Sequence, residues 1–206
     1  MVGDFNAWNA VAALAAAAHE GGEIDAATER LATFPGVPGR MQVIQARPFA
    51  VVVDFAHTAP ALAKALAATT PAGGRRIVVV GAAGERDPGK RAPLGVAAVA
   101  GADLAIFTEE DARSEDVGAI LEQLAAGART AGGEEGAAFV RIGDRREAIR
   151  EAVRRARPGD VVLLAGKGHE TTLERADGAR PWNEVDEARS ALAALHATNG
   201  ARRPLR

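Results

Sequence analysis

Five short apolar runs, separated by stretches of helical composition, constrain the fold of this chain more than any other feature. The runs are rich in β-branched residues and end in Gly, Asp, Glu or His; they cover residues 49–57, 76–82, 103–110, 137–144 and 160–170. Helices are predicted between and after them, at residues 59–69, 90–100, 115–127, 145–157 and 184–197. Apolar strands that alternate with helical crossovers are typical of a mainly parallel sheet. The sequence therefore predicts an α/β fold with helices on both faces of the sheet.

Two more helices are predicted ahead of the first strand. Residues 7–19 have helix-forming composition and are followed by Gly21 and Gly22, and residues 23–34 are followed by the turn at Pro35. Between the later elements, the Gly-rich segment 131–137 is predicted to be a surface turn, and residues 199–206 a flexible basic tail.

The composition excludes several classes of protein. A chain of 206 residues buries a sizeable core, and a net charge of −2 with scattered arginines gives no basic stripe for nucleic acid. The absence of cysteine excludes disulfides and thiolate metal sites. No apolar run approaches the roughly 20 residues of a membrane span, and no signal-peptide pattern is present. We therefore expect a cytoplasmic protein that binds neither nucleic acid nor membranes.

Polar residues and glycines follow four of the predicted strands. Asp54 and His57 follow the first strand, residues 81–90 the second, residues 108–113 the third and residues 166–170 the fifth. In open parallel sheets, ligands bind beyond the carboxyl ends of the strands. We therefore expect these four segments to converge on one rim and to form the functional site.

The loop that follows the second strand is close to a phosphate-binding loop. Residues 84–90 fit the pattern G-x-x-x-x-G-K, but Arg91 replaces the Ser or Thr that would ligate Mg²⁺. Glu85 and Asp87 would also place negative charge beside a phosphate. Arg86 is better suited to hold a carboxylate through two parallel hydrogen bonds. A surface ion pair between Arg86 and one of these acids is an equally open interpretation.

Charged residues crowd the end of the third strand. Ser114 is suited to cap the next helix, but capping does not explain the acids at 109–111 beside Arg113. Like charges repel unless a cation is near, so a zwitterionic ligand would satisfy this group. On charge alone, a solvated surface run is favoured.

The segment at residues 166–170 contains glycines that permit positive φ or close approach of a ligand. The sequence contains no H-E-x-x-H or G-x-S-x-G motif.

The order of these motifs identifies a family. The segments are "FNAWNAVAALAAA", "FPGVPGRMQVI", "FAVVVDFAHTAPAL", "GAAGERDPGKR", "TEEDARSED", "GDRREAIREAV" and "GDVVLLAGKGHE". In this order they resemble the second half of the Mur ligases, most closely the members that form the UDP-N-acetylmuramoyl tripeptide. The resemblance covers about residues 3–190.

The resemblance implies an ATP-dependent ligase with three domains. One domain binds the UDP sugar, a central ATPase carries a true phosphate loop and the Mg²⁺ ligands, and a Rossmann-like C-terminal domain recruits the amino acid. Residues 1–36 would be the last helices of the central domain, residues 37–198 the C-terminal domain and residues 199–206 the tail. This chain would then hold no catalytic residue and no metal ligand. Alone it would be inactive, as a fragment or as a half-enzyme completed by domains in trans.

The resemblance also implies two sets of site residues. The nucleotide-binding set would be Asn9, near adenine, with Arg40, Asp54 and His57 near the ribose and phosphates. The set that binds the diamino acid would be Arg86, Glu110, Asp111, Arg113, Gly166 and Glu170. Substrates would be ATP, a diamino acid and UDP-MurNAc-L-Ala-D-Glu.

The identity of the diamino acid stays open at this point. The family motif D-N-P-R stands here as Glu110-Asp111-Ala112-Arg113. The retained arginine favours the distal carboxylate of meso-diaminopimelate, which is our first choice, whereas the two acids favour the plain ammonium of lysine or ornithine. Two other functions remain as alternatives: a non-catalytic module that binds a diamino acid, and a ligase of the folate-polyglutamylating group. The Arg113 and 166–170 motifs argue against the second of these.

Overall fold

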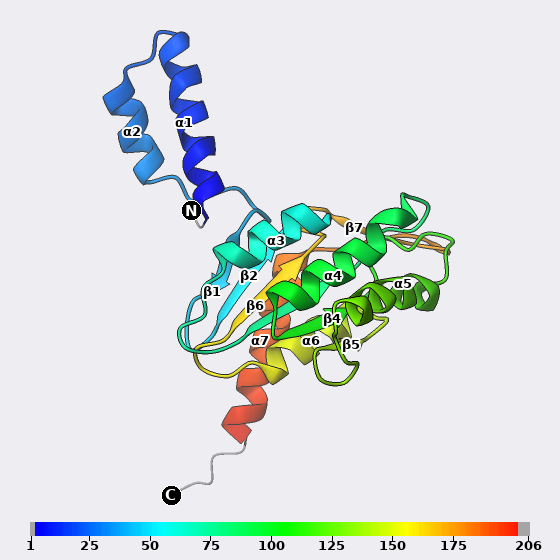
Figure 1. Ribbon diagram of the computed structural model, residues 1–206. Helices are drawn as coiled ribbons and strands as arrows, with labels where there is room; N and C mark the ends of the chain where they lie inside the picture. The colour runs from blue at the N-terminus through cyan, green and yellow to red at the C-terminus, as the bar shows by residue number, and fades with distance from the viewer. Residues whose placement is uncertain (1–2, 202–206) are drawn as a thin grey trace, which may run out of the picture.

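A six-stranded sheet forms the centre of the molecule (Figure 1). The computed structural model describes residues 3–201, with side chains to residue 198. The strands are β1 (Gln42–Gln45), β2 (Ala50–Asp54), β3 (Arg76–Val80), β4 (Leu104–Phe107), β5 (Phe139–Arg141) and β6 (Val161–Ala165), in the order β1-β2-β6-β3-β4-β5. All neighbouring strands run parallel except β1, which pairs antiparallel with β2. The predicted mainly parallel sheet is confirmed.

Edge strand β1 was not predicted from the sequence. It has only four residues, with glutamine at both ends and none of the four side chains buried. Its strand conformation comes from pairing with β2, where Gln42 lies opposite Val53 and Val43 opposite Val52. Such a short segment has no periodicity that local sequence would reveal.

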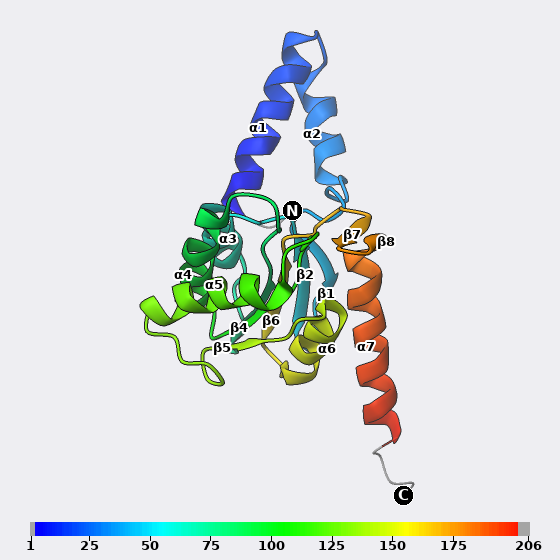
Figure 2. The same cartoon turned by 90° about the vertical axis from the view of Figure 1, so that its right-hand side faces the viewer.

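Helices cover both faces of the sheet, as predicted. Helices α3 (Ala59–Ala68), α4 (Arg91–Gly101) and α5 (Val117–Thr130) lie on one face, and α6 (Arg145–Arg155) and α7 (Glu184–Ala201) on the other (Figure 2). A single 3₁₀ turn, η1 (Pro88–Lys90), precedes α4.

The two faces of the sheet bury alternate residues of each strand. Val78 of β3 belongs to one core cluster, with Leu124 of α5, while its neighbour Val79 belongs to a second cluster, with Ile149 of α6. Because successive strand residues point to opposite faces, a strand buried on both sides must be apolar throughout. This is why the central strands are continuous runs of Val, Ile, Leu and Ala.

Side chains at the rim fix where the crossover helices begin. Thr58 accepts a hydrogen bond from the N–H of Ala61, and Asp116 accepts one from Ala119, so these residues cap α3 and α5. The prediction that Ser114 caps α5 is wrong, because Asp116 makes this bond. The Ser114 hydroxyl instead donates to the carboxylate of Glu85.

Helices α1 (Asp4–His19) and α2 (Ile24–Ala32) form a hairpin that stands away from the sheet (Figures 1 and 2). Neither helix contains a buried residue, and Trp8 is 75% exposed. A linker that contains Pro35 and Gly36 joins the hairpin to β1. Within residues 3–201, no helix is long and apolar enough to cross a bilayer.

A small hairpin after β6 was missed by the sequence analysis. Strands β7 (Thr172–Arg175) and β8 (Gly178–Pro181) pair antiparallel around a two-residue loop. The signal was present, because Asp177-Gly178 is a favoured turn sequence and Gly178 has a φ of 116°. Of the predicted tail, residues 199–201 continue the backbone of α7, and the rest lies outside the described residues.

Candidate functional site

The loops that follow β3 and β4 pack tightly against each other at the carboxyl ends of the strands. The N–H of Gly84 donates to the carbonyl of Asp111 over 2.7 Å. A Cβ at Gly84 would lie 2.0 Å from the carbonyl oxygen of Ala112, so no larger residue fits there without displacing backbone. The predicted convergence of these two segments therefore exists, and it brings the loop of Arg86 against the charged segment 109–113.

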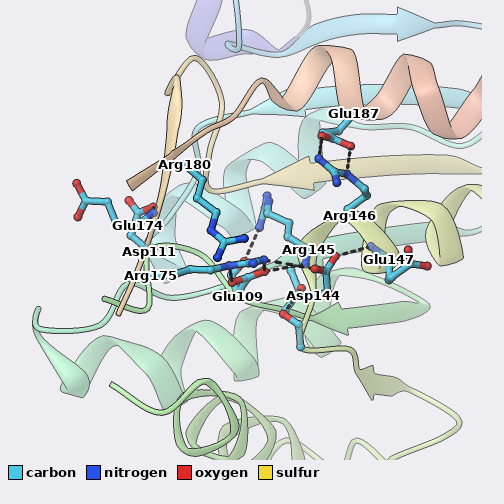
Figure 3. A network of polar contacts seen from close by, with 12 residues as sticks. Glu109, Asp111, Asp144, Arg145, Arg146, Glu147, Glu174, Arg175, Arg180 and Glu187 are labelled. Carbon is cyan, nitrogen blue, oxygen red and sulfur yellow. Dashed lines mark hydrogen bonds and ion pairs between the residues drawn. The ribbon is translucent and has the colours of Figure 1, made fainter. Parts of the chain in front are cut away.

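The first acid of the charged segment is neutralised within the chain. Glu109, which is buried, accepts from the Arg175 guanidinium on β7, with Arg175 Nε 2.8 Å from Oε2 (Figure 3). Asp144 lies 3.3 Å from the same guanidinium. The sequence analysis missed Arg175 because it lies on the unpredicted β7–β8 hairpin.

Asp111 is also paired within the chain. Its Oδ1 lies 2.8 Å from Nζ of the fully buried Lys167 and also accepts from the N–H of Glu174, 2.9 Å away. Lys167 contacts a second carboxylate, that of Glu170, at 2.7 Å. The predicted site residues Asp111 and Glu170 are thus joined through a lysine between β6 and the β7–β8 hairpin.

Glu110 differs from both of its acidic neighbours. Its side chain is 5% exposed, and its Oε2 has no hydrogen-bond partner among the described residues. Burial raises the pKa of Glu110, while Arg145, Lys90, Lys167 and His57 oppose that rise. A buried carboxylate without a partner is costly, so this oxygen is the unsatisfied acceptor of the rim.

Gly166 makes room for the Glu110 carboxylate. A Cβ at Gly166 would lie 2.6 Å from Oε2 of Glu110, and the φ of Gly166 is 107°. Two predicted residues from the ends of β4 and β6 are therefore in direct contact.

Arg113 is held by its own chain. Its Nε lies 2.7 Å from Oε2 of Glu174, and its Nη1 donates to the carbonyl of Gly84 at 2.6 Å. Its backbone N–H donates to the carbonyl of Glu174, and its φ is 53°. The arginine that the sequence analysis assigned to a distal carboxylate thus already has a carboxylate partner.

Arg86 has no ion-pair partner among residues 3–198. It is exposed on the loop after β3, and Glu85, an alternative partner, accepts from Ser114 instead. Arg91 is nearly fully buried and lies 2.8 Å from Glu115, with its Nη2 donating to the carbonyl of Ala83. The arginine that replaces the Ser or Thr of a phosphate loop thus anchors the loop to the interior.

Behind the rim lies a further buried cation that the sequence did not reveal. Arg145 and Glu184 are fully buried and lie 2.6 Å apart, and Arg145 also donates to the carbonyls of Glu109 and Ala165. Trp182 Nε1 donates to Glu184 at 2.7 Å. This group connects α6 and α7 to the ends of β4 and β6, so it holds the rim in place. No sequence pattern marked Arg145 as different from its exposed neighbour Arg146 (Figure 3).

Three predicted nucleotide-site residues lie beside the end of β2. Asp54 accepts from the backbone N–H groups of Met41 and Ala56, both at 2.9 Å, so it fixes the turn that carries Arg40. The guanidinium of Arg40 lies 4.4 Å from the centroid of the Phe55 ring. Nδ1 of His57 lies 2.9 Å from the carbonyl oxygen of Phe55.

Two glycines join the residues predicted to bind the nucleotide to those predicted to bind the amino acid. A Cβ at Gly39 would lie 2.3 Å from backbone atoms of Gly168 and His169, so the loop before β1 touches the loop after β6. Asn9 lies apart on α1, where its Nδ2 donates to Oδ1 of Asn6 at 3.2 Å. The structure brings nine of the ten predicted residues to the rim and leaves Asn9 on the hairpin.

Among the described side chains, no group of three or more His, Asp or Glu residues is arranged to hold a metal ion.

The fold and the rim define a class: an α/β domain with a Rossmann-like sheet and a charged rim at the carboxyl ends of its strands. Residues 39–168 match the family model described as the Mur ligase, glutamate ligase domain. The chain belongs to the Mur ligase family, as the motif order predicted, and residues 39–168 match the C-terminal domain of that family.

Curated relatives support the same assignment. The UDP-N-acetylmuramyl-tripeptide synthetase of Deinococcus radiodurans is 54% identical over 198 residues, which are 94% of this chain and 40% of that protein. The UDP-N-acetylmuramoyl-L-alanyl-D-glutamate–2,6-diaminopimelate ligase of Geobacillus kaustophilus is 43% identical over 173 residues, or 83% of this chain and 35% of that protein. The chain thus spans about 40% or less of the length of these relatives.

Solved structures share the fold. A structure of a UDP-N-acetylmuramoyl-L-alanyl-D-glutamate–2,6-diaminopimelate ligase has a TM-score of 0.71 and 37% identity, covering 95% of this chain and 40% of that one. The folylpolyglutamate synthase of Mycobacterium tuberculosis has a TM-score of 0.58 at 22% identity, covering 81% of this chain and 38% of that one. The latter likeness shows the fold alone.

Proposed function

We propose that this chain is the amino-acid-recruiting part of an ATP-dependent ligase that adds a diamino acid to UDP-MurNAc-L-Ala-D-Glu in peptidoglycan synthesis. The diamino acid is meso-diaminopimelate, lysine or ornithine. Residues 1–36 belong to the central domain and residues 37–198 to the C-terminal domain. The proposal includes a cytoplasmic location, where ATP is available.

One observation carries this proposal: the rim offers an unpaired cation and, on an adjoining loop, a buried carboxyl group with an unsatisfied oxygen. Arg86 has no acidic partner among the described residues, and Oε2 of Glu110 has no donor. An amino acid brings both missing charges, a carboxylate for Arg86 and an ammonium for Glu110. Desolvated hydrogen bonds between charged groups are stronger than those between neutral groups, so a zwitterion suits this rim.

The nucleotide residues support the second half of the proposal. Arg40, Asp54 and His57 lie next to the loop of Gly168, so a nucleotide bound by them would adjoin the amino-acid group. Asn9, on the α1–α2 hairpin, would bind near the adenine of the nucleotide. ATP would bind between this domain and the central domain, which would hold the phosphates and most Mg²⁺ ligands.

The chemistry assigns a positioning task to this chain. ATP phosphorylates the carboxylate of the acceptor peptide; the free amine of the diamino acid then attacks the acyl carbon, the C–O bond to phosphate breaks, and the amine loses a proton. Arg86 and Glu110 would orient the amine by holding the two ends of the amino acid. Correct orientation alone supplies a large part of the rate in such reactions.

A segment exchange tests the proposed function. The 198-residue region of the Deinococcus radiodurans relative that aligns with this chain is replaced by this chain, and phosphate release is measured with ATP, UDP-MurNAc-dipeptide and each diamino acid. We expect release that requires a diamino acid, and none from this chain alone. Release only with glutamate would favour the folate-polyglutamylating group. Binding of a diamino acid by the chain, together with an inactive but folded exchange protein, would favour a non-catalytic module.

A further inference from the structure

The part of the rim around Arg113 determines which diamino acid fits, if the proposed function holds. A distal carboxylate, such as that of meso-diaminopimelate, needs a free cation. Arg113 is engaged by Glu174 at 2.7 Å and by the carbonyl of Gly84 at 2.6 Å. A second carboxylate would have to displace Glu174, and the like charges of two carboxylates beside one arginine repel each other.

Lys167, a second cation in this region, is also saturated. Nζ of Lys167 lies 2.8 Å from Asp111 and 2.7 Å from Glu170, and the lysine is fully buried. One ammonium between two carboxylates leaves a net negative charge. This pair therefore attracts a cation and repels a further anion.

Glu110 adds a further carboxyl group to this region. It is 5% exposed, its Oε2 has no hydrogen-bond donor among the described residues, and a Cβ at Gly166 would lie 2.6 Å from that oxygen. Burial raises the pKa of this carboxyl, which reflects the cost of the unpaired charge. A ligand ammonium at this oxygen would remove that cost.

We infer that the diamino acid of this ligase carries a single carboxylate, as lysine and ornithine do, and that Glu174 excludes the second carboxylate by occupying Arg113. The distal ammonium binds Glu110 beside Gly166. This inference replaces the first choice drawn from the sequence, meso-diaminopimelate, which rested on Arg113 being free.

Chemical-shift titrations of the 206-residue chain with four amino acids test this inference. The ligands are L-lysine, L-ornithine, meso-diaminopimelate and L-norleucine, which lacks the distal amine. We expect lysine or ornithine to shift the amide resonances around Gly166 and to bind at least about tenfold more tightly than the other two.

Each other outcome has a distinct meaning. Binding of meso-diaminopimelate as tight as that of lysine and ornithine, or tighter, overturns the inference and leaves the recruiting function intact. Equal binding of norleucine overturns the role of the distal ammonium. Failure of all four to bind overturns both the inference and the amino-acid site of the proposed function.

A variant isolates the role of Glu174. In Glu174→Gln, Arg113 loses its anionic partner, and we expect the preference for lysine or ornithine over meso-diaminopimelate to fall by about tenfold. Glu122→Gln is the matched control, because Glu122 is an exposed acid of α5 that pairs with Arg129 and Arg141. An unchanged preference in Glu174→Gln, in a variant that keeps the wild-type spectrum elsewhere, contradicts the assigned role.

Discussion

Arg145 and Glu184 form a fully buried ion pair in which Nη2 and Oε1 lie 2.6 Å apart. The pair joins the start of α6 to the start of α7, and the same guanidinium donates to the carbonyl of Ala165 at the end of β6. Both charges are removed from water, so each depends on the other. The rim loops are therefore supported from behind by an electrostatic contact between segments 39 residues apart.

The buried pair predicts a large loss of stability when one partner is neutralised. Glu184→Gln leaves the Arg145 charge buried without its counterion, and we expect a loss of about 3–5 kcal/mol in the free energy of unfolding. Asp186→Asn, on the same helix, changes an exposed pair with Arg189 and should cost less than about 1 kcal/mol. Urea denaturation of both variants measures the difference, and similar losses would contradict the burial argument.

Glu110 predicts a dependence of stability on pH. Its pKa in the folded chain is raised above the ordinary value of 4.5 by burial. A raised carboxyl pKa gives stability that is complete below the unfolded-state pKa and is lost as pH rises through the folded-state pKa. Glu110→Gln removes this loss, so the variant should be more stable than the wild type at about pH 8 and should approach it at about pH 4.

Urea titrations at several pH values measure this effect. Glu29→Gln, at an exposed position on α2, reports the background effect of the substitution. If the free energies of unfolding of Glu110→Gln and the wild type differed by the same amount over the whole pH range, Glu110 would have the same pKa in the folded and unfolded states.

The contact between the loops of Gly39 and Gly168 predicts an unequal response to alanine. At Gly39 a Cβ would lie 2.3 Å from backbone, and the φ is 67°; at Gly36 the φ is 92°, but nothing lies within 4 Å. Gly36→Ala should therefore cost only the backbone strain of about 1–2 kcal/mol. Gly39→Ala should cost about 1–3 kcal/mol more, because the two loops must separate. Thermal unfolding compares them, and equal losses would exclude tight contact.

The α1–α2 hairpin is expected to exchange its amide hydrogens much faster than the sheet. Neither helix buries a residue, whereas Val79 of β3 and Leu164 of β6 are fully buried. Local opening costs little where few apolar contacts are broken. Hydrogen exchange followed by mass spectrometry tests this expectation. If the amide hydrogens of α1 exchanged as slowly as those of β3, the hairpin would have to be in contact with other protein surface in solution.

The sequence revealed most of the fold because the signals there are local and repeated. The run RIVVVGA predicted a strand at residues 76–82, where β3 covers residues 76–80, and the alternation of such runs with helices predicted the parallel sheet. The antiparallel β1 was missed because its conformation depends on pairing with β2. The β7–β8 hairpin was missed although Asp177-Gly178 marks its turn. Because Glu174 and Arg175 lie on this hairpin, they were not predicted as partners of Arg113 and Glu109.

The sequence by itself determined the family, the sheet and the segments that meet at the rim, because strand order and motif order are properties of the chain. Only the tertiary structure decided which charges at the rim are free. Glu109, Asp111 and Arg113 are neutralised by Arg175, Lys167 and Glu174, which lie 66, 56 and 61 positions away in the sequence. Charge pairing depends on distance and burial in space, so Glu110 and Arg86 stand out as unpaired only after the chain is folded.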